Sequence, residues 1–179
     1  MAGTFESRDL TAWAKETILT LFNNSNIGGT FTSPPTYSTA TTSLSNNSTS
    51  NIVISELKDL NGDAETIVTR GKRKHVCDFT FLLLWSLHVQ PAAAPTIDSD
   101  PSSTTAATPV AAAPIVIEAS LLIQDLSADG DYDTTFTLIT PRNKVSPQNY
   151  DLFDKSKKEL LLRVKHTVAL FLEQLKAKV

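Results

Sequence analysis

The longest regular pattern in the chain is an alternation of apolar and other side chains that follows a basic run. The basic run lies within residues 70–75, and the alternation extends from 77 to 89. Its apolar members are the odd positions Cys77, Phe79, Phe81, Leu83, Trp85, Leu87 and Val89. A period of two predicts a β-strand, and at roughly 3.3 Å per residue this strand extends about 45 Å. We therefore expect an elongated domain with the basic run at one end.

Two other segments repeat apolar residues every three or four positions, which is typical of amphipathic helices. The first covers residues 10–22, with Ser7 or Asp9 available as a cap. The second begins after Ser146, a good N-cap followed by Pro147 in the first helical turn, and has about 30 residues. Its apolar positions are Leu161, Val164, Val168, Leu172, Leu175 and Val179. We expect this long helix to lie along the long strand and cover one of its faces.

Shorter alternating stretches predict the other strands of an antiparallel meander. One strand begins near Asn51, the sequence Asn61-Gly62-Asp63 is typical of a hairpin turn, and residues 64–70 form the next strand. Residues 115–126 form a further strand, and a turn and a last strand follow before Pro141. The sequence thus predicts an α+β fold with an N-terminal helix, an antiparallel meander containing one very long strand, and a long C-terminal helix packed on the sheet.

Two segments of biased composition interrupt these patterns. Between 23 and 50, 19 of 28 residues are Ser, Thr or Asn, and between 90 and 114, 20 of 25 are Ala, Pro, Ser or Thr. Such segments bury too little apolar surface to offset the entropy lost on ordering. We therefore expect a single domain of residues 1–179 with low-complexity insertions at 23–50 and 90–114.

Net charge, cysteine content and hydropathy indicate the cellular compartment and the kinds of partner to expect. The net charge of −3 gives the whole chain no general attraction to nucleic acid or anionic membranes, so an electrostatic partner would have to be recognised locally. The chain has one cysteine, no leader in its first ten residues, and no apolar stretch as long as a membrane helix. We expect a soluble, monomeric protein of the cytoplasm that does not bind membranes.

Residue types that serve catalysis or bind metals are present, but their spacing matches no established site. The three histidines fall on different predicted elements, and Cys77 lies on the apolar face of the long strand. The four aspartates within residues 125–133 resemble a calcium loop, but the terminal Glu of an EF-hand is missing. We therefore expect no catalytic residue, metal or cofactor, and a small enzyme that uses Cys77 or the acidic turn stays open as a third hypothesis.

The basic run is the strongest candidate for a binding site. It contains four positive charges within five residues, at Arg70, Lys72, Arg73 and Lys74. Held at the end of a rigid strand, these charges suit an acidic surface on a partner. The alternative is that they belong to a solvated turn with no binding role. Nucleic acid is the competing partner, but the aromatic residues of the strand lie on the face that we assign to the core, so they offer no stacking platform. A nucleic-acid-associated module is therefore the second hypothesis.

Several features occur in an order that resembles a known family. They are the sequence Gly62-Asp63-Ala64-Glu65, the basic run Gly71-Lys72-Arg73-Lys74, residues 75–79 entering the long strand, an opening helix with Trp13, the Leu126-Ser127 step and the long last helix. This ordered set resembles the N-terminal domain of the activators of the 90-kDa heat-shock protein (chaperone) ATPase. The resemblance covers nearly the whole chain outside the two insertions.

The resemblance implies a cochaperone that has no catalytic residues, binds the middle segment of the chaperone and raises its ATP turnover. Carried over by position, it implies a partner-binding set of Asp63, Arg70, Lys72, Arg73, Lys74, Val76 and Ile117. Gly71 stands where the family has an arginine, so either the turn is one residue longer or Arg70 substitutes. The second domain of longer members does not follow Val179, which leaves a single-domain branch or a domain of a longer protein.

Overall fold

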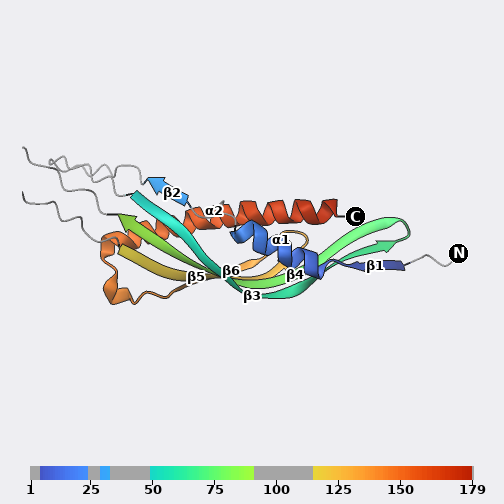
Figure 1. Cartoon of the computed structure of the whole chain (residues 1–179), viewed down its shortest axis with the longest axis horizontal. Coiled ribbons are helices and arrows are strands. Elements are labelled where there is room, and N and C mark those ends of the chain that lie inside the picture. The colour runs from blue at the N-terminus through green and yellow to red at the C-terminus, as the bar shows by residue number, and fades with distance from the viewer. Residues whose placement is uncertain (1–4, 24–28, 33–48, 91–114, 179) are drawn as a thin grey trace, which may run out of the picture.

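The computed structural model describes residues 5–23, 29–32, 49–90 and 115–178, which form one sheet, two α-helices and a short 3-10 helix (Figure 1). All strand pairs are antiparallel, in the order β1-β3-β4-β5-β6, and β2 also pairs with β3. In chain order the elements are β1 (Phe5–Asp9), α1 (Thr11–Asn23), β2 (Gly29–Thr32), β3 (Thr49–Thr69), β4 (Lys72–Gln90), β5 (Ile115–Ser127), β6 (Asp133–Leu138), the 3-10 helix (Arg142–Lys144) and α2 (Pro147–Ala177). This is the α+β architecture expected from the sequence.

Strands β3 and β4 form the long axis of the sheet. They have 21 and 19 residues and pair along almost their whole length. The alternation that predicted β4 is confirmed, because the odd positions from Cys77 to Val89 are all 4% exposed or less. One face of β4 therefore belongs entirely to the core, and the other faces outward.

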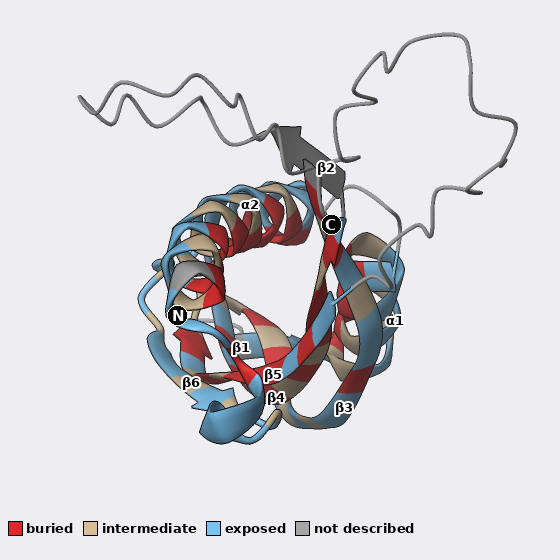
Figure 2. Ribbon diagram, turned by 90° about the vertical axis from the view of Figure 1, so that its left-hand side faces the viewer, coloured by how far each residue is buried: buried red, intermediate tan, exposed pale blue. Residues whose placement is uncertain are grey.

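Helix α2 covers the inner face of the curved sheet (Figures 1 and 2). The rings of Trp85 and Phe153 stack with centroids 5.2 Å apart, and Phe79 meets Phe171 edge-on at 6.0 Å, so the helix follows β4. The predicted N-terminus is confirmed, since the Ser146 hydroxyl accepts a hydrogen bond from the Asn149 amide. The helix buries Phe153, Leu160, Val164, Val168, Phe171, Leu172 and Leu175. No helix in the described part of the chain combines the length and apolar character needed to cross a membrane.

One core position of α2 differs from the sequence expectation. Leu161 is half-buried, and the neighbouring Leu160 is fully buried instead. The other expected positions from Val164 to Leu175 are buried as predicted, so the difference is local to this turn, and Leu161 lines a groove instead. Val179, also expected in this set, lies outside the described residues.

The prediction of a hairpin turn at Asn61-Gly62-Asp63 is wrong, because β3 continues through these residues without reversing direction. Gly62 has φ 127°, and a Cβ at this position would lie 1.9 Å from the carbonyl oxygen of Asp78. Its positive φ therefore allows a close approach between strands rather than a reversal of the chain. Nearby, between Lys58 and Asn61, β3 has one extra residue relative to β4. A second register shift lies in the β4–β5 pair, where Phe79 and Phe81 pair with Leu126 and Ile123, so the extra residue is in β5.

Two strands were not expected from the sequence. Strand β1 pairs with β3 just before α1, and Asp9 at its end accepts a hydrogen bond from the Thr11 amide at 2.8 Å. Strand β2 lies within the segment expected to be an insertion and pairs with the beginning of β3. Residues 24–28 and 33–48 of that segment, and residues 91–114 of the second insertion, lie outside the described residues.

Candidate partner-binding surface

The basic run is located at a tight turn between β3 and β4. Strand β3 ends at Thr69 and β4 begins at Lys72, so Arg70 and Gly71 alone form the connection. Both have positive φ, 50° at Arg70 and 76° at Gly71, which is the backbone of a two-residue turn of type I′. This turn matches the right-handed twist of the strands, so the basic run continues the sheet as a rigid end. We call residues 67–76 the basic hairpin.

The alternation of the strand divides the basic hairpin between two faces. Val76 is 39% exposed on the outer face, which is turned away from α2, while Cys77 beside it is buried on the inner face. Because side chains alternate along a strand, Lys72 and Lys74 project from the outer face with Val76. Arg73 projects from the other face. The basic run therefore offers two different surfaces rather than one cluster.

The outer face also receives side chains from β3 and β1. Across the strand pair, Lys74 is opposite Ile67, and Val76 is opposite Glu65. Glu65 accepts a hydrogen bond from the hydroxyl of Ser7 on β1. Half-buried Ile67 thus adds apolar surface beside Lys74, and β1 supports Glu65 from the side. Sequence reasoning missed Ile67 and Glu65 as site residues because it did not give the register of β3.

Two carboxylates follow the lysines along the same outer face. Asp78 comes two residues after Val76, and Asp63 lies directly opposite it on β3. Both are exposed. The outer face therefore changes from cationic at Lys72 and Lys74, through apolar Val76, to anionic at Asp78 and Asp63. In the part of the chain that the structure describes, no ion pair involves the basic residues of the hairpin.

The inner corner of the basic hairpin holds a histidine. His75 Nδ1 lies 2.8 Å from the Thr66 hydroxyl. Burial, and then the charges of Arg73 and Lys176, lower the pKa of His75 below its ordinary value. The imidazole is therefore neutral at pH 7, and the hydrogen bond to Thr66 fixes the ring between β3 and β4.

Ile117 does not belong to this surface. It is fully buried and pairs with Leu87, near the opposite end of β4 from Lys72. A partner could reach it only by opening the core between the sheet and α2. Of the positions implied by the resemblance, the structure brings together Asp63, Lys72, Lys74 and Val76 on one face, and it places Arg70 in the turn above them.

The residues considered for catalysis or stacking lie elsewhere. Burial, with smaller contributions from Asp78, Asp63 and Asp129, raises the pKa of the Cys77 thiol to about 11, so the thiol is protonated and poorly nucleophilic at pH 7. Among the described residues, no group of three His, Cys, Asp or Glu side chains could hold a metal ion. The strand aromatics Phe79, Phe81 and Trp85 are 1% exposed or less, so they cannot stack on nucleic acid bases.

Comparison with known proteins shows a family and a similar solved structure. Residues 7–179 match the family described as activator of Hsp90 ATPase, N-terminal. Among solved structures, the chain is similar to the crystal structure of Aha-1 from Plasmodium falciparum, with a TM-score of 0.52 and 13% sequence identity. That likeness covers 96% of this chain and 90% of the other, and at this identity it shows a shared fold. A comparison with curated protein sequences gives no match.

Proposed function

This chain belongs to the family of activators of the Hsp90 ATPase, as its N-terminal domain, and from this we propose that it binds the middle segment of Hsp90 through the outer face of the basic hairpin. A member of this family acts on the ATPase of another protein, so its own residues have to recognise and orient that protein. The features of the basic hairpin that suit this task are its rigidity, its charges and its exposed apolar side chains.

The observation that carries the proposal is the arrangement of Lys72 and Lys74 beside Val76. Neither lysine forms an ion pair within the described residues, so a partner's carboxylates can approach both without displacing an intramolecular partner. Val76 and the neighbouring Ile67 supply apolar surface at the same place. Charges that steer association and a small apolar patch that is buried on contact are the usual parts of a specific interface.

The order of charges along the outer face also sets the orientation of the partner. From the turn inward the order is cationic, apolar and anionic, ending at Asp78 and Asp63. We expect the docking surface on Hsp90 to present carboxylates, then an apolar patch, then cations. A partner rotated by half a turn would place like charges opposite each other, which costs binding free energy.

Activation requires that the bound chain favour one conformation of Hsp90 over another. We propose that docking stabilises the conformation in which the catalytic loop of the Hsp90 middle segment is released for ATP hydrolysis. The increase in turnover can then be no larger than the difference in this chain's affinity for the two conformations allows. The cytoplasmic location and the monomeric state expected from the sequence stay predictions.

The first prediction concerns steady-state ATP hydrolysis by Hsp90 with increasing amounts of this chain. The wild-type chain should raise turnover, and Lys72→Glu/Lys74→Glu should weaken the apparent affinity by about tenfold or more, because it replaces two attractions by two repulsions. Arg142→Glu/Lys144→Glu is the control matched in charge, since both residues are exposed cations in the 3-10 helix outside the hairpin. Calorimetric titration of the isolated middle segment locates the contact.

The outcomes separate the parts of the proposal. If the folded double variant stimulates turnover like the wild type, the basic hairpin is not the docking surface. If the wild type binds Hsp90 but leaves turnover unchanged, this chain is an anchor and the proposed activation is wrong. If the chain binds Hsp90 but not its middle segment, only the proposed position of the docking site on Hsp90 is wrong.

A further inference from the structure

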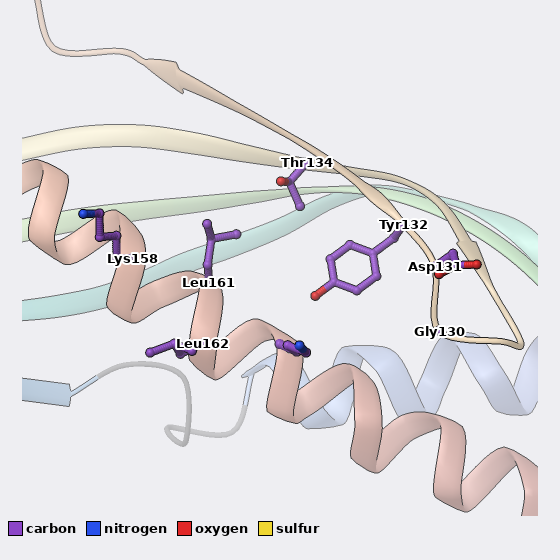
Figure 3. Close-up of a pocket in the computed structure, with 8 residues that line it drawn as sticks. Gly130, Asp131, Tyr132, Thr134, Lys158, Leu161 and Leu162 are labelled. Carbon is purple, nitrogen blue, oxygen red and sulfur yellow. The ribbon is translucent and has the colours of Figure 1, made fainter.

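A groove of about 620 Å³ lies between α2 and the beginning of β6, and none of its lining residues belongs to the basic hairpin (Figure 3). One side is formed by the turn before β6 and by its first residues, including Tyr132 and Thr134. The other side is formed by α2, through Lys158, Leu161, Leu162 and Lys165. The ring of Tyr132 points from the strand side towards the helix (Figure 3). The groove therefore has an apolar floor between a helix and a strand.

The strand side of the groove is a free edge of the sheet. Of the strands that the structure describes, β6 is the last in the sheet order and pairs with β5 alone. Viewed along the long axis, the sheet curls from β6 round to β3, and α2 lies across the opening (Figure 2). Among the described residues, β6 forms no backbone hydrogen bond to an element beyond β5. Its outward amide and carbonyl groups are therefore available to an added strand.

The helix side of the groove combines two cations with exposed apolar surface. Lys158 and Lys165 are separated by seven residues, roughly 10 Å along the helix, and neither forms an ion pair within the described part of the chain. Leu162 lies between them and is 65% exposed, more than any other large hydrophobic residue that the structure describes. Lys157, in contrast, pairs with Asp154 and lies over the Phe136 ring. The groove thus presents cation, apolar patch and cation in sequence.

We propose that this groove binds an extended peptide segment that adds a strand to β6 and carries two carboxylates on either side of an apolar side chain. In an extended segment, alternate residues face the same side. An acidic, an apolar and a second acidic residue at positions i, i+2 and i+4 therefore span about 13 Å, which the flexible lysine side chains can accommodate. The apolar residue would cover Leu161 and Leu162. The Asp131 carboxylate on the opposite rim disfavours a third acid there.

The free edge favours a peptide over the other anionic partners that lysines attract. A lipid surface or a nucleic acid can pair with Lys158 and Lys165, but neither can satisfy the unpaired backbone groups of β6. The site is also distinct from the basic hairpin, so this inference does not rest on the proposed docking to Hsp90. One chain could hold both partners, because the hairpin uses the outer face of the sheet and the groove lies between its edge and α2.

The test is a titration of the isotope-labelled full chain with the blocked peptide Thr-Glu-Thr-Leu-Thr-Glu-Thr, followed by amide chemical shifts. Shifts should concentrate in β6 and in the middle of α2, and a heptapeptide should bind in roughly the 0.1–1 mM range. Lys158→Glu/Lys165→Glu should weaken binding about tenfold or more. Lys155→Glu, an exposed lysine of the same helix that does not line the groove, and Lys72→Glu/Lys74→Glu should bind within about twofold of the wild type.

Two further peptides test the mode of binding. The peptide with Gln in place of both Glu residues should lose most of its affinity, and a peptide with alternate amides N-methylated should lose the ability to pair with β6. The proposal is overturned if the wild type does not bind the peptide, if the double groove variant binds it equally well, or if N-methylation has no effect. It is also overturned if Lys158→Glu/Lys165→Glu reduces cosedimentation of the chain with phosphatidylserine vesicles but leaves peptide binding unchanged.

Discussion

At the scale of single residues, Gly62 determines how closely β3 can approach β4. Its φ of 127° belongs to a region that other residues rarely adopt, and the Asp78 carbonyl occupies the space that a Cβ would need. Gly71 also has a positive φ, but a Cβ there would meet no atom within 4 Å. Replacing Gly62 would therefore cause both a clash and backbone strain, whereas replacing Gly71 would cause backbone strain alone.

We predict that Gly62→Ala lowers the free energy of unfolding by about 3 kcal/mol or more, because strain and a backbone clash add. Gly71→Ala should cost about 1–2 kcal/mol, since only the strain applies. Urea denaturation of both variants and the wild type measures the difference. Equal losses in the two variants would mean that β3 can move away from Asp78 at little cost.

Single residues also show what sequence alone could not decide. An Asn-Gly pair is a strong signal for a hairpin turn, and Asn61-Gly62 satisfies it, yet the turn is formed by Arg70 and Gly71. Tertiary pairing with β4 overrides the local preference of Asn61-Gly62. The exposure of Val76 followed from alternation along its own strand, whereas the proximity of Ile67 and Glu65 depends on a register between strands that no local pattern contains.

At the scale of elements, the basic hairpin depends on a turn that carries an unfavourable residue. Type I′ turns require positive φ at both central positions, and Asn followed by Gly is the preferred pair. Arg70 adopts φ 50° in this turn, a conformation that costs a residue with a long side chain more than it costs Asn. The positive charge at the end of the hairpin is therefore held at a cost in backbone strain.

We predict that Arg70→Asn raises the free energy of unfolding by about 0.5–1 kcal/mol, because Asn tolerates the left-handed conformation. The same variant should weaken stimulation of Hsp90 if the Arg70 guanidinium contacts the partner. Thermal denaturation gives the first quantity and the ATPase titration the second. A variant that is less stable than the wild type would show that Arg70 makes stabilising contacts across the turn.

The elements that could be predicted from sequence are those with long periodic patterns. Thirteen alternating residues in β4 and the capped, periodic α2 leave little ambiguity about type or position. Strands β1 and β2 have five and four residues, too few to establish a period. They form because the edge of β3 that does not pair with β4 is open to them. The groove between β6 and α2 was not predicted, because it depends on how far the helix lies from the sheet edge.

At the scale of the whole molecule, Phe171 joins three elements in one aromatic contact. Its ring lies 6.0 Å from Phe79 on β4 and 6.5 Å from Trp13 on α1, while its backbone belongs to α2. It is fully buried. This contact fixes the end of α2 nearest the basic hairpin to both the sheet and the first helix.

We predict that Phe171→Ala lowers the free energy of unfolding by about 3–5 kcal/mol, the usual cost of removing a buried phenyl ring. Leu162→Ala is the control on the same helix and should change stability by less than about 0.5 kcal/mol, because Leu162 is mostly exposed. Chemical denaturation followed by circular dichroism measures both. A small loss in Phe171→Ala would mean that Trp13 and Phe79 collapse into the vacated space.

The cover that α2 provides has a consequence for biosynthesis. The first helix already covers Phe81 through Phe22, but Phe79 and Trp85 contact Phe171 and Phe153 of α2 only once residues 147–177 are made. While the ribosome is still translating α2, a finished sheet would expose a long aromatic surface, and such surfaces promote aggregation of nascent chains. A protein of a family that assists a chaperone would thus itself need protection until its last helix emerges.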